Sequence, residues 1–185
     1  MARILIVGGG CRGRRFAARM VEQGHAVRAT TRSEDGRAAI EACGAECWIG
    51  TPDRLATLRG ALDSVTIACW MLAAAHGRGD DVGALHASRL QFFLTQAIDT
   101  TVRGFVYDAW PAGPAGVRPE VLAGGERIVR SLAQLNAIPV AVLDAETAGR
   151  GSAEGRVGGE ESDADEGWVA AACAAVEVLL GGDGR

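Results

Sequence analysis

Short apolar runs recur along the first 143 residues of the chain. They lie at residues 3–7, 26–30, 45–49, 64–70, 103–107 and 140–143. Runs of this length, bounded by glycine and polar residues, are typical of strands that are buried on both faces of a sheet. The pattern therefore predicts six strands.

Longer segments with apolar residues at helical spacing separate these strands and follow the last one. They lie at residues 14–22, 33–43, 51–60, 82–98, 120–135 and 166–181. Strands and helices that alternate through short connections form a parallel sheet with right-handed crossovers, so we expect an α/β fold. The segment 82–98 is apolar on more than one stripe, which indicates deep burial or an interface shared with a partner subunit.

Residues 144–165 break this pattern. The segment is rich in Gly, Ala, Ser and acidic residues, and Val157 is its only large apolar side chain. Such a segment cannot bury much surface, so we predict a flexible, acidic, glycine-rich loop. With 185 residues, 48% of them hydrophobic, the chain 1–185 fits a single domain in which the helix 166–181 packs back on the sheet.

A glycine cluster follows the first strand directly. Gly8, Gly10 and Gly13 match the G-x-G-x-x-G spacing, and the helix 14–22 comes next. In this context the motif predicts a dinucleotide site, with the N–H groups of the helix start facing the phosphates. Gly8 permits a tight exit from the strand, Gly10 lets a pyrophosphate approach the backbone, and Gly13 lets the helix pack closely. The alternative is a glycine-rich turn without a ligand.

The end of the second strand selects the nicotinamide cofactor. An acidic residue there binds the ribose hydroxyls of NAD, whereas an arginine pairs with the 2′-phosphate of NADP. The chain has Arg32 at this position, between the hydroxyls of Thr31 and Ser33, and Arg12 in the glycine loop is a second candidate for the same phosphate. We therefore expect NADP(H) rather than NAD(H). The alternative is that Arg32 is a solvated surface residue.

Two further residues complete the predicted cofactor site. Trp70 ends the fourth strand, and ligands bind at the carboxyl ends of parallel strands. Cys11 lies at the start of the first helix, where a thiolate is favoured. The predicted cofactor-binding residues are therefore Gly8, Gly10, Cys11, Arg12, Gly13, Thr31, Arg32, Ser33 and Trp70.

Composition argues against several other classes of protein. The formal net charge of −4 argues against a dedicated nucleic-acid binder. The longest apolar run, around residues 67–75, is too short to span a bilayer, and no signal peptide is evident. The five cysteines form neither a disulfide framework nor the spacing of a zinc site. We expect a cytoplasmic protein without a membrane span or a metal site.

Several of these stretches together are similar to those of a known family. The residues 4–13, the strand end at 27–32, the strand at 102–107 and the segment 125–143 resemble the short-chain dehydrogenase/reductase superfamily, in its extended or atypical (NmrA-like) branch. The resemblance implies a three-layer Rossmann fold, with a parallel sheet of about six strands in the order 3-2-1-4-5-6, and NAD(P) binding. It also implies a homodimer formed through the helices 82–98 and 120–135.

The chain departs from this family at the catalytic residues. The family uses a tyrosine and a lysine four residues later, and the lysine lowers the pKa of the tyrosine. Here the single tyrosine is Tyr107, Pro111 stands four residues after it, and Ala109 aligns with the family's serine. All 19 basic residues are arginine, whose pKa is too high to replace the lysine fully. The standard dehydrogenase mechanism is therefore absent.

Three functional hypotheses follow. A non-catalytic or sensor-type NADP(H)-binding protein agrees best with the missing residues. The alternative is an atypical NADPH-dependent oxidoreductase or epimerase-like enzyme, for which His76, Tyr107 and Asp108 are candidate groups near the cleft and no catalytic residue is assigned. The third hypothesis is a Rossmann scaffold that has lost its cofactor.

Overall fold

The computed structural model describes residues 1–112, 116–144 and 161–181, with the backbone alone for 161–164. Its centre is a six-stranded parallel sheet in the order β3-β2-β1-β4-β5-β6. This order confirms the predicted α/β Rossmann topology. The strands are β1 Arg3–Val7, β2 Ala26–Thr31, β3 Glu46–Ile49, β4 Ile67–Trp70, β5 Gly104–Asp108 and β6 Val140–Leu143.

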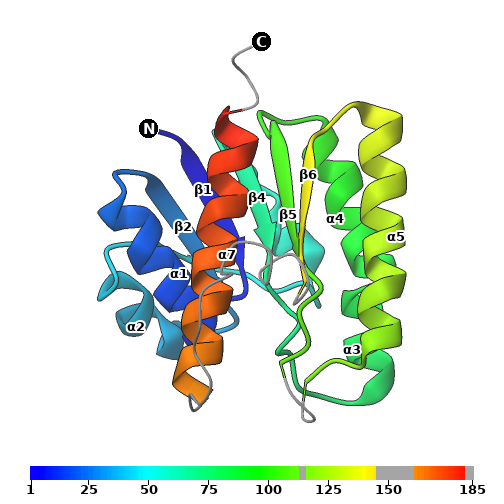
Figure 1. Ribbon diagram of the computed structural model, residues 1–185, viewed down its shortest axis with the longest axis horizontal. Coiled ribbons are helices and arrows are strands. Elements are labelled where there is room, and N and C mark those ends of the chain that lie inside the picture. The colour runs from blue at the N-terminus through cyan, green and yellow to red at the C-terminus, as the bar shows by residue number, and fades with distance from the viewer. Residues whose placement is uncertain (113–115, 145–160, 182–185) are drawn as a thin grey trace, which may run out of the picture.

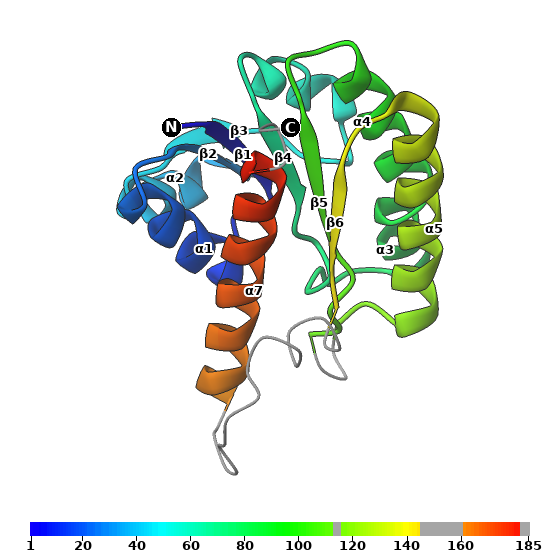
Figure 2. The ribbon, with the colours of Figure 1, turned by 45° about the horizontal axis from the view of Figure 1, so that its top comes forward.

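Helices cover both faces of this sheet, which makes three layers (Figure 1). One face carries α1, α2 and α7, and the other carries α3, α4 and α5, as Figure 2 shows from a second direction. The helices are α1 Cys11–Glu22, α2 Arg37–Glu41, α3 Gly79–Leu85, α4 Ser88–Ile98, α5 Pro119–Asn136 and α7 Glu161–Gly181. No helix in these residues is long and apolar enough to cross a bilayer.

The central strand β1 supplies both halves of the core. Ile4 and Ile6 pack in the cluster that contains Phe16 of α1, while Leu5 packs in the cluster that contains Phe93 of α4. Side chains of a strand point alternately to the two faces, so a run of consecutive apolar residues serves both layers. The chain reverses its direction of winding between β1 and β4, and this places the carboxyl end of β1 at the switch point of the sheet, where α/β proteins bind ligands.

The predicted helix over 82–98 is interrupted, because the chain turns at His86 and Ala87. The structure has α3 up to Leu85 and α4 from Ser88. The His86 side chain is buried, with its Nδ1 2.7 Å from the Tyr107 hydroxyl oxygen. Because this pairing needs a residue from β5, helical periodicity within the segment did not reveal the break.

The predicted helix over 51–60 is replaced by two short 3₁₀ turns, Leu55–Leu58 and Gly60–Leu62. The hydroxyl of Thr57 donates to the carbonyl of Arg54 at 2.6 Å and accepts a bond from the amide of Thr51 at 3.0 Å. Threonine side chains that bind nearby backbone groups compete with regular helix formation. The residues 33–43 are likewise split, into a 3₁₀ turn at Glu34–Gly36 followed by α2.

The C-terminal helix α7 begins earlier than predicted. It starts at Glu161, within the segment expected to be a loop, and it packs against β5, β6 and α1. The rest of the predicted acidic loop, residues 145–160, lies outside the described residues.

Candidate functional site

The loop between β1 and α1 is built from glycines that allow close backbone contacts. Gly8 has a φ of +123°, and a Cβ at this position would collide with the carbonyl of Met71, just after β4. A Cβ at Gly13 would collide with the carbonyl of Gly8, so the first turn of α1 packs directly on the loop. These two glycines therefore set the shape of the loop, because any side chain would push α1 or β4 away.

Thr30, at the end of β2, holds the loop in place. Its hydroxyl accepts a hydrogen bond from the amide of Gly8 at 3.2 Å, and its carbonyl accepts one from the amide of Gly9 at 3.0 Å. The residue is only 4% exposed. The sequence interpretation missed this contact, although a polar residue at the end of a buried strand, next to the glycine loop, was the available signal.

Gly10 is the open position of the loop. A Cβ there would meet no heavy atom within 4 Å. Gly10 is also the N-cap of α1 and supplies no side-chain capping bond. The amides of Cys11, Arg12 and Gly13 have no acceptor within the described part of the chain. A helix start with free N–H groups and open space in front of it can hold an anion.

The end of β2 presents one free cation beside this loop. Arg32 is exposed and forms no ion pair with any residue that the structure describes. Its neighbours are already engaged, since the Thr31 hydroxyl donates to the carbonyl of Ser33 at 3.3 Å and the Ser33 hydroxyl donates to Asp35 at 3.2 Å. Of the three residues at the end of β2 that were predicted to meet a 2′-phosphate, Arg32 is the one whose donors are free within the described residues.

Arg12 lies on the other side of the loop. Its Nε donates to Asp165 at 2.5 Å, and its guanidinium lies 5.7 Å from the centre of the Trp168 ring; both partners belong to α7. Arg32, in contrast, follows β2 and forms no ion pair with α7 in the described residues. That Arg12 shares one phosphate with Arg32 therefore stays a prediction, and in this arrangement Arg12 is already engaged by α7. The pairing joins residues 153 positions apart, and no local pattern reveals it.

Asp108 forms a buried polar centre at the carboxyl end of β5. Its Oδ1 accepts hydrogen bonds from the Trp168 indole at 3.1 Å and from the Trp110 amide at 3.1 Å. Burial raises the pKa of Asp108 to about 6, although the Trp168 hydrogen bond and the Arg12 charge oppose the shift. The Trp168 partner was not predicted, because it comes from the last helix of the chain.

Tyr107 and His86 lie in the core, away from the glycine loop. Tyr107 donates to the Leu122 carbonyl at 3.2 Å and contacts His86, and burial raises the pKa of its hydroxyl well above the ordinary range. Burial also lowers the pKa of His86 to about 4. Neither group is placed to exchange protons with a ligand at the loop, whereas His76 is exposed in the segment after β4.

Trp70 does not present its side chain to the predicted site. The indole is fully buried beneath α4, with its ring centre 5.0 Å from that of Phe93. Successive side chains of a strand point to opposite faces of the sheet. The Trp70 side chain points to the face covered by α4, so only its backbone borders the loop. Cys11, in contrast, is exposed at the start of α1, with Arg14 Nη2 3.5 Å from its sulfur.

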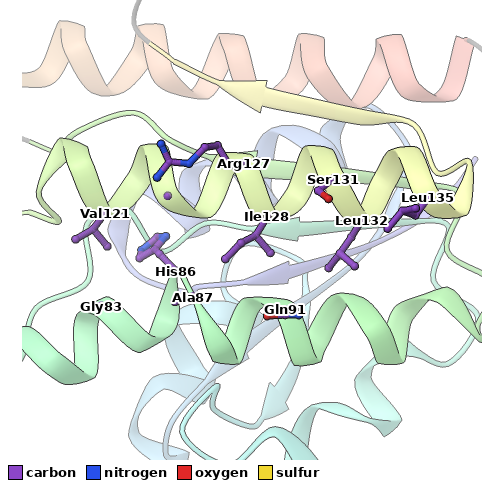
Figure 3. A pocket seen from close by; sticks show the side chains of 11 residues that line it. Gly83, His86, Ala87, Gln91, Val121, Arg127, Ile128, Ser131, Leu132 and Leu135 are labelled. Atoms are coloured by element: carbon purple, nitrogen blue, oxygen red, sulfur yellow. The ribbon is translucent and has the colours of Figure 1, made fainter.

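A separate hollow lies between α4 and α5, on the opposite face of the sheet (Figure 3). It has a volume of about 730 Å³, and Ile128 and Leu132 of α5 point into it across from Gln91 of α4. Phe92 and Leu135, which are 52% and 78% exposed, belong to the same two helices. This apolar surface is distant from the glycine loop. In the described ranges, no group of three or more His, Cys, Asp or Glu residues could hold a metal ion.

The strand order and the glycine loop at the switch point define a Rossmann fold. The chain is similar to a short-chain dehydrogenase/reductase superfamily protein from Agrobacterium tumefaciens with bound NAD, at a TM-score of 0.62 and 22% identity over 77% of this chain and 48% of that one. It is also similar to UDP-glucose 4-epimerase from Thermotoga maritima with UDP-glucose. The TM-score is 0.65 and the identity 14%, over 77% of this chain and 54% of that one. A third similar structure is vestitone reductase from alfalfa. The TM-score is 0.59 and the identity 13%, over 78% of this chain and 56% of that one.

These likenesses show that the chain has the fold of the short-chain dehydrogenase/reductase and epimerase structures. The chain spans about half the length of each of these solved structures. No protein-family model and no curated protein matches the sequence.

Proposed function

We propose that the chain binds NADP(H) at the β1–α1 loop as a non-catalytic or sensor-type protein. The observation that carries the proposal is the open Gly10, in front of the unpaired amides of α1. The exposed Arg32 supports a preference for the 2′-phosphate, because its guanidinium has no partner in the described residues. That one of the similar structures contains bound NAD supports the same use of the loop here.

The absence of the Tyr–Lys pair from the sequence supports a non-catalytic role. Tyr107, the single tyrosine, is buried on the α4 side, and its raised pKa opposes proton transfer at neutral pH. No lysine is present in the sequence to lower it. A hydride donor bound at the loop would therefore lack the proton donor on which the family relies.

An atypical NADPH-dependent oxidoreductase or epimerase-like enzyme is the second candidate, and Asp108 is the observation that favours it. A carboxyl with a pKa near 6 at the carboxyl end of a central strand is suited to general acid–base chemistry. The group is 2% exposed, so a substrate would have to displace Trp168 or Trp110 to reach it. This obstacle makes the enzyme the weaker candidate.

We further propose that two copies of the chain associate through α4 and α5. The exposed Phe92 and Leu135 and the apolar hollow between these helices support this arrangement. Size-exclusion chromatography with light scattering tests it: Phe92→Glu should convert the dimer to a monomer. A wild-type monomer at micromolar concentration would contradict it.

Isothermal titration with NADPH and NADH tests the cofactor proposal. We expect NADPH to bind more tightly, and Arg32→Gln to weaken NADPH binding by about tenfold or more while leaving NADH unchanged, as expected for the loss of a charge-assisted hydrogen bond. Arg103→Gln is the matched control. Arg103 is an exposed arginine just before β5, at the amino-terminal ends of the strands, whereas the glycine loop follows the carboxyl end of β1. No binding of either dinucleotide would refute the proposed function.

A further inference from the structure

One carboxylate of α7 contacts two arginines at the start of α1. Asp165 Oδ1 accepts from Arg12 Nε at 2.5 Å, and Oδ2 lies 3.4 Å from Arg15 Nη1. The Asp165 and Arg12 side chains are 26% and 19% exposed, so this pair is screened less by water and salt than a surface pair. Figure 1 shows α7 running beside α1.

Arg12 keeps further hydrogen-bonding capacity in this position. Its Nη1 is buried and has no acceptor in the described residues, while its Nε is used by Asp165. Trp168 holds the plane of the guanidinium from one side. A guanidinium offers five donors in a planar fork that suits a phosphate. Arg12 is thus positioned to bind an anion, and the Asp165 carboxylate already binds it.

The same residue borders the open part of the loop. Arg12 comes two positions after Gly10, and its own amide is one of the unpaired donors of the helix start. A phosphate held at these amides and the Asp165 carboxylate would both be anions close to one guanidinium. They would repel each other, and Arg12 could satisfy only one of them fully.

We propose that Asp165 is an internal counter-anion that competes with a ligand phosphate for Arg12, and so lowers the affinity of the loop for dinucleotides. The idea rests on the proposed function, since it assumes that the loop is the phosphate site. By this proposal, Asp165 near the start of α7 regulates the glycine loop. The affinity of the loop for a dinucleotide then depends on where α7 begins.

The test is calorimetric titration of the full chain with NADPH and, separately, with inorganic pyrophosphate at low salt. We expect Asp165→Asn to bind both ligands about fivefold more tightly than the wild type, as expected from removing one nearby negative charge. Glu166→Gln is the matched control, because it removes the same charge from the next, exposed residue. Its affinity should stay within about twofold of the wild type, since its carboxylate contacts neither arginine in the described structure.

The Arg12→Gln background isolates the competition. There Asp165→Asn should tighten binding clearly less than it does in the wild-type background, because the group for which the two anions compete is gone and only their direct repulsion remains. Equal or weaker binding by Asp165→Asn, or a gain that is just as large in the Arg12→Gln background, would overturn the inference. If no variant binds NADPH but Asp165→Asn still tightens pyrophosphate binding, the cofactor proposal fails and the competition stands. Urea unfolding of each variant checks that all are folded.

Discussion

The buried carboxyl of Asp108 should give the protein an unusual dependence of stability on pH. Its pKa rises from the ordinary 3.8 to about 6 in the folded state, because burial disfavours the charged form. A group whose pKa is raised by folding stabilises the folded state fully below the unfolded pKa, and this contribution is lost as the pH rises through the folded pKa. Asp108 should therefore favour folding at pH 4 and oppose it at pH 7.

The size of the effect follows from the shift. The difference between 3.8 and about 6 corresponds to about 3 kcal/mol of unfolding free energy. Asp108→Asn removes this titration and keeps an oxygen that can accept from Trp168 and Trp110. The free energy of unfolding of Asp108→Asn minus that of the wild type should therefore increase by about 2.4 kcal/mol between pH 4 and pH 7, since the unfolded carboxyl is already partly ionised at pH 4.

Urea unfolding at half-unit pH steps measures this difference directly. Any constant cost of the asparagine cancels, and so do the titrations of all the other groups that the two proteins share. A difference that stays flat from pH 4 to pH 7 would show that Asp108 titrates as it does in the unfolded chain. A difference that falls over this interval would refute the argument from burial altogether.

Two further predictions use the other features of the loop and the core. Gly13→Ala places a Cβ against the Gly8 carbonyl and should lower the free energy of unfolding in urea by about 1–3 kcal/mol. The Cβ of Gly10→Ala meets no neighbour, so this variant should lose less than about 1 kcal/mol yet bind NADPH more weakly in the titration. Equal stabilities of the two variants would contradict the packing role of Gly13. His86 has a folded pKa lowered from 6.5 to about 4, so its contribution is present above pH 6.5 and is lost as the pH falls toward 4. The stability advantage of the wild type over His86→Gln should shrink by about 3 kcal/mol over that interval, and an advantage that is constant or grows would exclude a buried neutral imidazole.

The opposite signs of Asp108 and His86 explain why the variants are needed. Between pH 6 and pH 4 the folded state gains stability from protonating Asp108, while the unfolded state gains it from protonating His86. The two contributions are similar in size and largely cancel in the wild type. A wild-type profile alone would thus hide both groups.

The fold was predictable because its main signals are local. Each strand of the sheet is a short apolar run, and each glycine of the motif comes at a fixed spacing after β1. The strand order followed from the resemblance to a known family together with the alternation of strands and helices. Two helix predictions were wrong because a side chain formed a hydrogen bond that helical periodicity does not reveal. The predicted helix 82–98 is interrupted at His86, which pairs with Tyr107. The predicted helix 51–60 is replaced by short turns, in which the Thr57 hydroxyl bonds the Arg54 carbonyl.

The candidate site was predictable in part for the same reason. Gly8, Gly10 and Gly13 lie within six residues of one another, and their roles depend on the backbone that they themselves form. Arg32 was placed by its distance in sequence from that loop. The contact between Arg12 and Asp165 was not predictable, because the two residues lie 153 positions apart.

The sequence by itself determined the parallel α/β sheet, the glycine loop with a helix behind it, and the lack of a lysine for the family's chemistry. These properties depend on residue types at short spacings or on composition, which the chain carries in any conformation. The tertiary structure alone decided that Trp70 is buried, that Asp108 is covered by Trp168, and that Arg12 faces α7. These properties depend on which distant segments pack together, and they arise only when burial brings such segments into contact.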